Sequence, residues 1–338
     1  MRIVFMLPFA TKPILTMFTH KDIENRSLFI INGVENQRLR VSAGRLLLET
    51  EGGTAITKLP FPKILSLMIV GHTTITTALI EHCNKHGVPV VVMKPNFRPV
   101  FYYGNMAEAN YLLRKQQFEH SIGVLEIAQA IIHNKLENQL LLLQKTRQKD
   151  ALTEAAKQQI LCCLEQIPKV QNYRELMGLE GRAAKAFFHA YFSFADWQQR
   201  QPRVKQDTLN ATLDIGYTML FNYLECMIRL FGFDPYMGVY HQLWFRRKSL
   251  VCDLMEPFRC IVEHQIRKCL KYGTFKTSNF EQHKNAWFLK PEHKRQYTQA
   301  FFESIIAHKS AIYKYVQQYY RCFMGRKSVT QYPKFRYE

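Results

Sequence analysis

The chain has 338 residues, of which 46 are Lys or Arg and 27 are Asp or Glu, giving a formal net charge of +19. A chain of this length exceeds one ordinary compact core, so two domains are expected. The excess of cations predicts a polyanionic partner, which leaves DNA, RNA or an anionic membrane surface as candidates. A hydrophobic content of 47% argues against wholesale disorder.

Short strand-like segments dominate the first 105 residues. They are rich in aliphatic residues and cover 28–31, 39–41, 45–49 and 88–92. Turn signals separate them at Ser42-Ala43-Gly44 and Gly52-Gly53. One helix is predicted from about Thr74 to His86, where Gly87 ends it. Residues 1–105 are therefore predicted to form a small antiparallel β-domain with one packed helix.

The longest apolar run does not predict a membrane span. It extends from Ile64 to Ile80, but Ser66, His72 and several threonines interrupt it, and a span needs about 20 apolar residues. The apolar N-terminus lacks the basic region and cleavage site of a signal peptide. The eight cysteines form no Cys-x-x-Cys pair, as expected of reduced, packed thiols. We expect a cytoplasmic protein with no membrane partner.

A helical period replaces the strand pattern after residue 107. The expected helices cover roughly 107–145, 151–165, 179–197, 206–231, 248–271 and 296–323. They predict an all-α domain over 106–324, larger than the first domain, so the fold class is α+β. Residues 325–338 form a basic tail that we expect to fray or to dock on a partner.

Three acidic or imidazole groups in the helical half fit one metal site: Glu180, His241 and Glu256. Carboxylates with one imidazole suit Mg²⁺ or Mn²⁺, the ions that phosphodiester chemistry needs. Asp253 precedes Glu256 by three residues, so on a helix the two share a face. Each residue alone also has an ordinary explanation, such as a solvated charge or an ion pair between Glu256 and Arg259.

Cations lie close in sequence to these acidic groups. They are Arg182, Lys185, Arg246, Arg247, Lys248 and Arg259. Any one of them is as well explained by solvation, but together they suit a surface that follows a DNA backbone. The sequence has no Gly-x-x-x-x-Gly-Lys-Ser/Thr loop, so nothing predicts nucleotide hydrolysis.

Four blocks of the helical half resemble, in the same order, the CRISPR-associated adaptation integrases, DNA endonucleases that insert new spacers into a CRISPR array. The blocks are Glu180-Gly181-Arg182-Ala183-Ala184, then Asp207 to Ala211 with Gly216-Tyr217, then Gly232 to Pro235 followed by Gly238-Val239-Tyr240-His241, and finally Asp253 to Arg259. The segments Thr76 to Ile80 and Gly87 to Val91 extend the resemblance into the N-terminal half.

The resemblance implies a metal site built from Glu180, His241 and Glu256, with Asp253 as a supporting catalytic acid. It implies Mg²⁺ or Mn²⁺ as cofactor and double-stranded and branched DNA as substrate. The activity would join the 3′-hydroxyl ends of spacer DNA to the CRISPR repeat by transesterification. It further implies a homodimer formed through the β-domain, with a small adaptation partner protein bridging two dimers.

Two other functions remain open at this stage. The chain could be a non-catalytic basic nucleic-acid-binding protein, in which the acidic residues are structural. It could also be a structure-selective DNA nuclease that cuts without integrating. Charge, spacing and composition do not choose between cutting and integration, and only the family resemblance favours integration.

Overall fold

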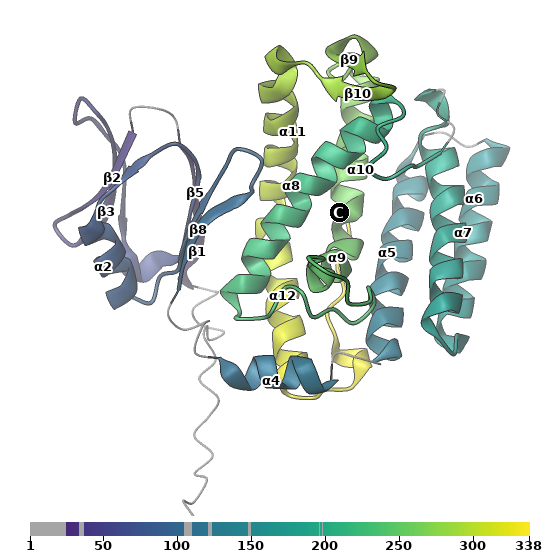
Figure 1. Ribbon diagram of the computed structural model, residues 1–338, viewed down its shortest axis with the longest axis horizontal. Helices are drawn as coiled ribbons and strands as arrows, with labels where there is room; N and C mark the ends of the chain where they lie inside the picture. Colours follow the sequence, from purple (N-terminus) through teal and green to yellow (C-terminus); the bar gives the residue numbers. More distant parts are fainter. Residues whose placement is uncertain are drawn as a thin grey trace, which may run out of the picture.

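The structure of the protein is a computed structural model that describes residues 25–33, 37–104, 110–120, 124–147, 150–195, 197 and 199–338. A strand-rich N-terminal domain is followed by a helical domain, which confirms the α+β fold class (Figure 1). The expected boundary at residue 105 falls on residues outside the described part, so the domain limits stay a prediction.

Two four-stranded sheets form the N-terminal domain. The first has the order β1 (Ser27–Gly33), β5 (Ile64–Gly71), β7 (Val90–Met93) and β8 (Pro99–Tyr103). The second has the order β4 (Ala55–Pro60), β3 (Arg45–Thr50), β2 (Gln37–Ser42) and β6 (Thr74–Ile75). The strands from β2 to β4 pair antiparallel as predicted, whereas β1, β5 and β7 run parallel, so the pairing in this domain is mixed.

The apolar run at Ile64 begins the central strand of the first sheet. Seven of the eight residues of β5 are buried, as expected for a strand covered on both faces. The predicted helix is present as α2 (Thr77–Lys85), and the Thr76 hydroxyl accepts a hydrogen bond from the Leu79 N–H at its start. Gly87 follows the helix with a φ of +61°, a conformation that glycine adopts without strain.

One face of the first sheet packs against helix α8 (Thr208–Leu230) of the helical domain. The Tyr102 hydroxyl donates to the Arg229 carbonyl at 3.0 Å, and the rings of Phe97 and Tyr223 lie 5.6 Å apart. Buried residues of this sheet and of the helical domain therefore form one cluster, and the sheet supports the helix at the centre of the molecule, while a second cluster lies within the N-terminal domain.

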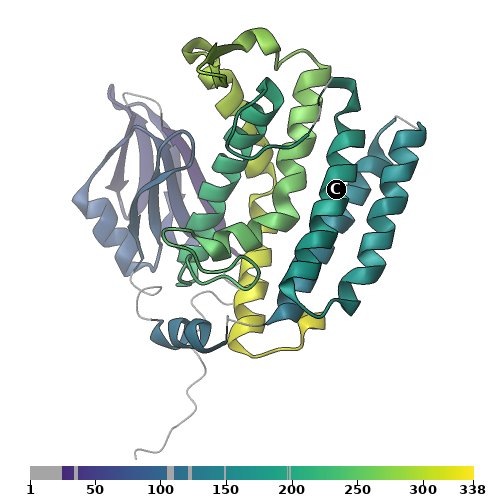
Figure 2. The same ribbon diagram turned by 45° about the vertical axis from the view of Figure 1, so that its right-hand side comes forward.

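Nine helices make up most of the described part of the second domain. They are α4 (Tyr111–His120), α5 (Leu125–Lys145), α6 (Ala151–Gln166), α7 (Tyr173–Tyr191), α8, α9 (Ser249–Met255), α10 (Arg259–Lys271), α11 (Lys294–Ala307) and α12 (Lys309–Met324). Figures 1 and 2 show α5, α6 and α7 side by side at the edge remote from the sheets. Within the described ranges, no helix is long and apolar enough to cross a membrane.

Several helix limits differ from the sequence-based prediction. The helix expected over 296–323 is two helices that meet at His308, and the one expected over 248–271 is interrupted by a 3-10 turn, Glu256–Phe258, that contains Pro257. A proline interrupts an α-helix because it has no N–H to donate. A short hairpin of β9 (Phe280–His283) and β10 (Ala286–Leu289) was not predicted.

Helix α7 begins six residues earlier than predicted, so the expectation that Glu180 lies at a helix start was wrong. The Asn172 side chain accepts a hydrogen bond from the Glu175 N–H at 3.0 Å and caps the helix there. The helix then continues through Gly178 and Gly181, where an added Cβ would meet nothing within 4 Å. Glu180 therefore projects from the middle of a rigid helix.

The C-terminal tail is packed within the chain, which contradicts the expectation that it frays. Phe335 and Tyr337 are buried, and their backbone N–H groups donate to the side-chain oxygens of Asn134 and Asn138 of α5, each at 2.8 Å. Both asparagine amides donate in turn to the Phe335 carbonyl. The tail therefore adds an extended segment along α5.

We predict that Phe335→Ala lowers the free energy of unfolding by about 3 to 5 kcal/mol, because it empties a buried aromatic site. The Phe335 ring lies 4.6 Å from that of Phe258, next to the turn that carries Glu256. Unfolding in urea measures the loss, and Arg336→Ala, an exposed neighbour, should change the value by less than about 0.5 kcal/mol. Equal effects of the two substitutions would contradict the packed tail.

Candidate active site

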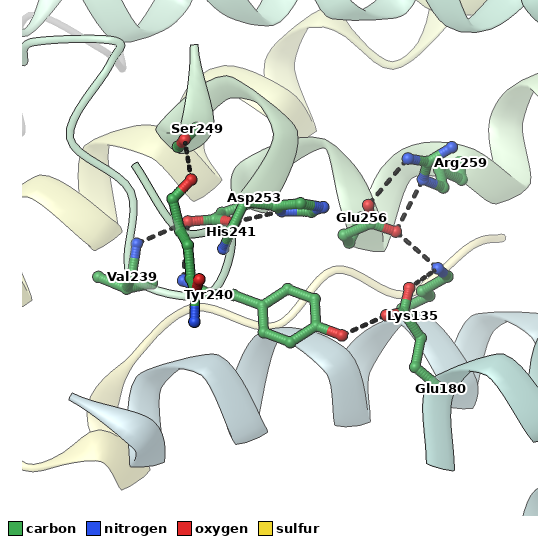
Figure 3. A network of polar contacts seen from close by, with 10 residues as sticks. Lys135, Glu180, Val239, Tyr240, His241, Ser249, Asp253, Glu256 and Arg259 are labelled. Atoms are coloured by element: carbon green, nitrogen blue, oxygen red, sulfur yellow. Dashed lines mark hydrogen bonds and ion pairs between the residues drawn. The ribbon is translucent and has the colours of Figure 1, made fainter. Parts of the chain in front are cut away.

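Two of the predicted site residues reach the same ammonium group. Glu180 comes from α7 and Glu256 from the 3-10 turn, and Lys135 of α5 lies between them (Figure 3). The Lys135 Nζ is 2.7 Å from Glu256 Oε2 and also donates to Glu180 Oε1. Lys135 was not among the residues predicted from the sequence. The structure thus brings together two carboxylates that are 76 residues apart, with a lysine between them.

Glu256 is buried between two cations. Its carboxylate accepts from Arg259 Nε at 2.7 Å and from Arg259 Nη2 at 2.9 Å, in addition to the contact with Lys135. Burial alone would raise the pKa of Glu256, but the charges of Arg259 and Lys135 outweigh it and hold the pKa well below its usual range. Glu256 is therefore ionised at neutral pH although it is only 1% exposed.

Asp253 binds the loop that carries His241. Its Oδ2 accepts from the backbone N–H groups of Val239 and Tyr240, at 2.6 and 3.0 Å, and its Oδ1 accepts from that of His241 at 2.9 Å. The Asp253 Oδ1 also lies 2.6 Å from His241 Nδ1. A carboxylate only accepts, so Nδ1 carries the proton and Nε2 of a neutral ring keeps its lone pair. Asp253 is thus a positioning residue for His241.

The approach of Asp253 to this loop leaves no space for a side chain at residue 238. A Cβ at Gly238 would lie 2.5 Å from Asp253 Oδ2 and 2.8 Å from the Ser249 carbonyl carbon. On the other side of the site, the Tyr240 hydroxyl donates to Glu180 Oε2. Burial, and secondly the Glu180 charge, raises the pKa of Tyr240, so its hydroxyl remains a donor. Each of the two glutamates therefore has a fixed orientation.

The donor set fits a hard divalent cation. Two carboxylates and one imidazole nitrogen are ligands that Mg²⁺ or Mn²⁺ accepts. Among the residues that the structure describes, however, no three His, Cys, Asp or Glu side chains are grouped as a metal centre. The carboxylates point to Lys135 and the imidazole pairs with Asp253, so the present arrangement is an ion-pair network.

A basic pocket of about 700 Å³ adjoins the two glutamates, and both Lys135 and Arg259 line it. Three further cations along its wall, Arg200, Arg203 and Lys205, were not predicted, although they form a basic run in the sequence. Their positions depend on the loop before α8, where Arg200 pairs with Asp214 at 2.6 Å. The pocket can therefore hold an anionic group beside the site.

The other predicted basic residues do not line this pocket. Arg182 and Lys185 are exposed on α7, and Arg246 is exposed in the loop after His241. Lys248 is paired with the buried Glu225 at 2.6 Å, so it is less available to a ligand than the sequence indicated. Of the six predicted cations, Arg259 alone lies within hydrogen-bond distance of a predicted site carboxylate in the described part of the chain.

Sequence comparison identifies the relatives of the chain. The sequence profile of the family described as CRISPR associated protein Cas1 matches residues 33–303, a span that contains Glu180, His241 and Glu256. The protein named CRISPR-associated endonuclease Cas1 3 of Thermus thermophilus is 29% identical over 248 residues, which cover 65% of this chain and 69% of that protein. CRISPR-associated endonuclease Cas1 1 of the same organism is 27% identical over 275 residues, covering 79% of this chain and 84% of that protein.

Solved structures share the fold. A chain of the structure described as a partial Cas6-RT-Cas1–Cas2 complex has a TM-score of 0.81 and 20% identity, and the match covers 93% of this chain and 99% of that chain. A casposase bound to integration product has a TM-score of 0.66 and 21% identity, over 89% of this chain and 96% of that chain. Both matches include the strand-rich and the helical parts.

The buried carboxyl group of Glu263, on the pocket wall, should make the free energy of unfolding depend on pH. Its Oε1 accepts from the Tyr217 hydroxyl at 2.7 Å, and its Oε2 is buried without a partner in the described structure. Burial raises the pKa of Glu263 from 4.5 to about 7. Between these values the native state binds more protons than the unfolded state, so its stability falls as pH rises, by about 1.4 kcal/mol per pH unit.

We predict that Glu263→Gln removes this slope, since glutamine is neutral at every pH. The free energy of unfolding of the two proteins, measured in denaturant at pH 5 and pH 8, should show the variant gaining about 3 kcal/mol relative to the parent at the higher pH. Other titrating groups cancel in the comparison. A constant difference between the proteins would show that Glu263 is ionised throughout.

Proposed function

Because the chain belongs to the Cas1 family of CRISPR-associated proteins, we propose that it is a metal-dependent DNA endonuclease and integrase of CRISPR adaptation. It joins the 3′-hydroxyl ends of spacer DNA to the CRISPR repeat by transesterification. The observation that carries the proposal is the convergence of Glu180 and Glu256 on one buried cation, with His241 positioned beside them by Asp253. The names of the relatives as endonucleases, and the likeness to a casposase bound to integration product, support it.

Glu180, Glu256 and the Nε2 of His241 would hold Mg²⁺ or Mn²⁺, which would polarise the phosphate and lower the pKa of the attacking hydroxyl. Asp253 accepts a hydrogen bond from the Nδ1–H of His241, which leaves Nε2 of the neutral ring unprotonated. Arg259 keeps Glu256 ionised and fixes its plane through two hydrogen bonds. Water in place of the 3′-hydroxyl gives hydrolysis at the same site.

The cations of the pocket position the substrate in this proposal. Arg200, Arg203 and Lys205 would contact phosphates of the DNA strand that enters the site, and such contacts fix register without reading sequence. The net charge of +19 supports a polyanionic substrate, which we propose to be double-stranded or branched DNA. We further propose a homodimer formed through the β-domain, with a small adaptation partner like the Cas2 of the similar complex bridging two dimers.

An integration assay separates this function from its two rivals. A labelled fragment is incubated with a supercoiled plasmid that carries the repeat, with and without Mn²⁺. Fragment joined covalently to plasmid supports integration, whereas cleavage without joining indicates a nuclease only. Binding of the DNA with neither product would leave the non-catalytic nucleic-acid-binding protein.

We predict that Glu180→Gln, His241→Ala and Glu256→Gln each abolish joining while DNA affinity stays near the parent value, since each removes a ligand but leaves the basic surface. Glutamine is chosen at 256 because alanine would leave Lys135 and Arg259 facing a buried void. Asp253→Asn should cost about 10- to 100-fold, as for a residue that orients a ligand. Glu165→Gln, on the exposed side of α6, is the control, and normal joining by any ligand variant would remove that residue from the site.

We also predict that Arg246→Ala/Arg247→Ala weakens DNA binding but leaves the joining rate at saturating DNA largely unchanged, because phosphate contacts act through binding. Lys248 is left in place since it pairs with Glu225. The DNA affinity of the parent should fall steeply between about 50 and 200 mM salt. For the double variant, the slope of log affinity against log salt concentration should be smaller by about two. Fluorescence anisotropy measures both, and an unchanged slope would place these arginines off the DNA path.

A further inference from the structure

We propose that Lys135 acts as an internal counter-cation that holds Glu180 and Glu256 together in the metal-free protein and is exchanged for the divalent cation when the site loads. The inference rests on the proposed function for the identity of the two glutamates as ligands. It adds a residue that competes with the metal and so sets how tightly, and when, the metal binds.

The position of Lys135 is fixed by the packing of α5. Its neighbour Asn134 is hydrogen-bonded to the backbone of Phe335, and Asn138, one turn further along the helix, donates to the Pro257 carbonyl at 3.3 Å. Pro257 directly follows Glu256 in the 3-10 turn. The helix that carries Lys135 is therefore hydrogen-bonded to the turn that carries Glu256. The Lys135 ammonium lies between the two carboxylates, and the residue is only 7% exposed.

The charges at this point are already balanced. Two carboxylates, Glu180 and Glu256, face two cations, Lys135 and Arg259, in a buried setting. If a divalent cation bound the two carboxylates while the ammonium stayed in contact, the two positive charges of the metal and the one of Lys135 would lie within a few ångströms of each other. Lys135 must therefore leave when both glutamates bind the metal, since Arg259 is held by its own paired hydrogen bonds to Glu256.

The basic pocket offers the displaced ammonium a place next to DNA. Lys135 lines this pocket together with Arg200, Arg203 and Lys205, and its flexible side chain can turn from the carboxylates toward the pocket without movement of α5. A DNA phosphate in the pocket would pair with the released ammonium. Metal and DNA would then each favour binding of the other, because coupling between two ligands is reciprocal.

Manganese binding to the DNA-free, full-length protein tests the exchange. The electron paramagnetic resonance signal of unbound Mn²⁺ gives the affinity of each protein for the ion. We expect Lys135→Met to bind Mn²⁺ at least about tenfold more tightly than the parent, because no fixed cation competes. The melting temperature of metal-free Lys135→Met should fall below that of the parent and recover with Mn²⁺. Short duplex DNA should raise the Mn²⁺ affinity of the parent and do so less for the variant.

Matched variants separate this idea from its alternatives. Lys314→Met, at an exposed lysine on α12, should bind Mn²⁺ as the parent does. Lys135→Arg keeps the charge and should bind Mn²⁺ no more tightly than the parent. If Lys135→Met does not fold, Lys135→Gln is compared with Lys135→Arg instead. In that pair, Lys135→Gln should bind Mn²⁺ more tightly than Lys135→Arg.

Equal or weaker Mn²⁺ binding by the neutral Lys135 variants would overturn the exchange and leave Lys135 as a structural partner of the glutamates. That result differs from a failure of the proposed function itself. If Glu180→Gln and Glu256→Gln both bound Mn²⁺ as tightly as the parent does, the glutamates would not be ligands and the metal site would lie elsewhere.

Discussion

Glu180 and Glu256 share one ammonium inside the helical domain, and the placement of three segments depends on that contact. A buried carboxylate without a partner would cost several kcal/mol, so α5, α7 and the turn after α9 are stable in this arrangement only while the charges match. Arg259 completes the balance from the first turn of α10. In the proposed exchange, the two carboxylates that need a buried counter-charge would accept a divalent cation in place of the ammonium.

Backbone interactions hold this polar centre in a fixed shape. The tail binds α5 through Asn134 and Asn138, and Asp253 binds three consecutive N–H groups of the loop that ends at His241. Both devices act through backbone N–H groups, and the tail adds the contact of Phe335 with Phe258 beside the turn that carries Glu256. The β-domain contributes more remotely, because its first sheet supports α8, and α8 carries Asp214 and Tyr217 on the pocket wall.

Sequence reasoning predicted the fold class and most of the helical segments, because these depend on local periodicity, and short motifs singled out Glu180 and Glu256, which meet at Lys135. It anticipated the pair between Glu256 and Arg259, whose spacing of three is a helical neighbour relation. It missed Lys135, since nothing in the sequence links a lysine on α5 to a glutamate 45 residues later on α7. It misplaced the start of α7, which begins after the Asn172 cap and continues through Gly178 and Gly181, where the surroundings are open.

The ligand set alone does not decide between cutting and joining. Water and a 3′-hydroxyl are both oxygen nucleophiles, and two carboxylates with an imidazole would activate either one in the same way. What differs is whether a DNA end is held in line with the scissile phosphate, which is a matter of positioning. In the proposed mechanism that task would fall to the cations of the pocket, Arg200, Arg203 and Lys205, and to Lys135 once it is released from the glutamates. The proposal therefore assigns the choice of nucleophile to the pocket that the sequence motifs did not reveal, and assigns to the motif residues the chemistry that both reactions would share.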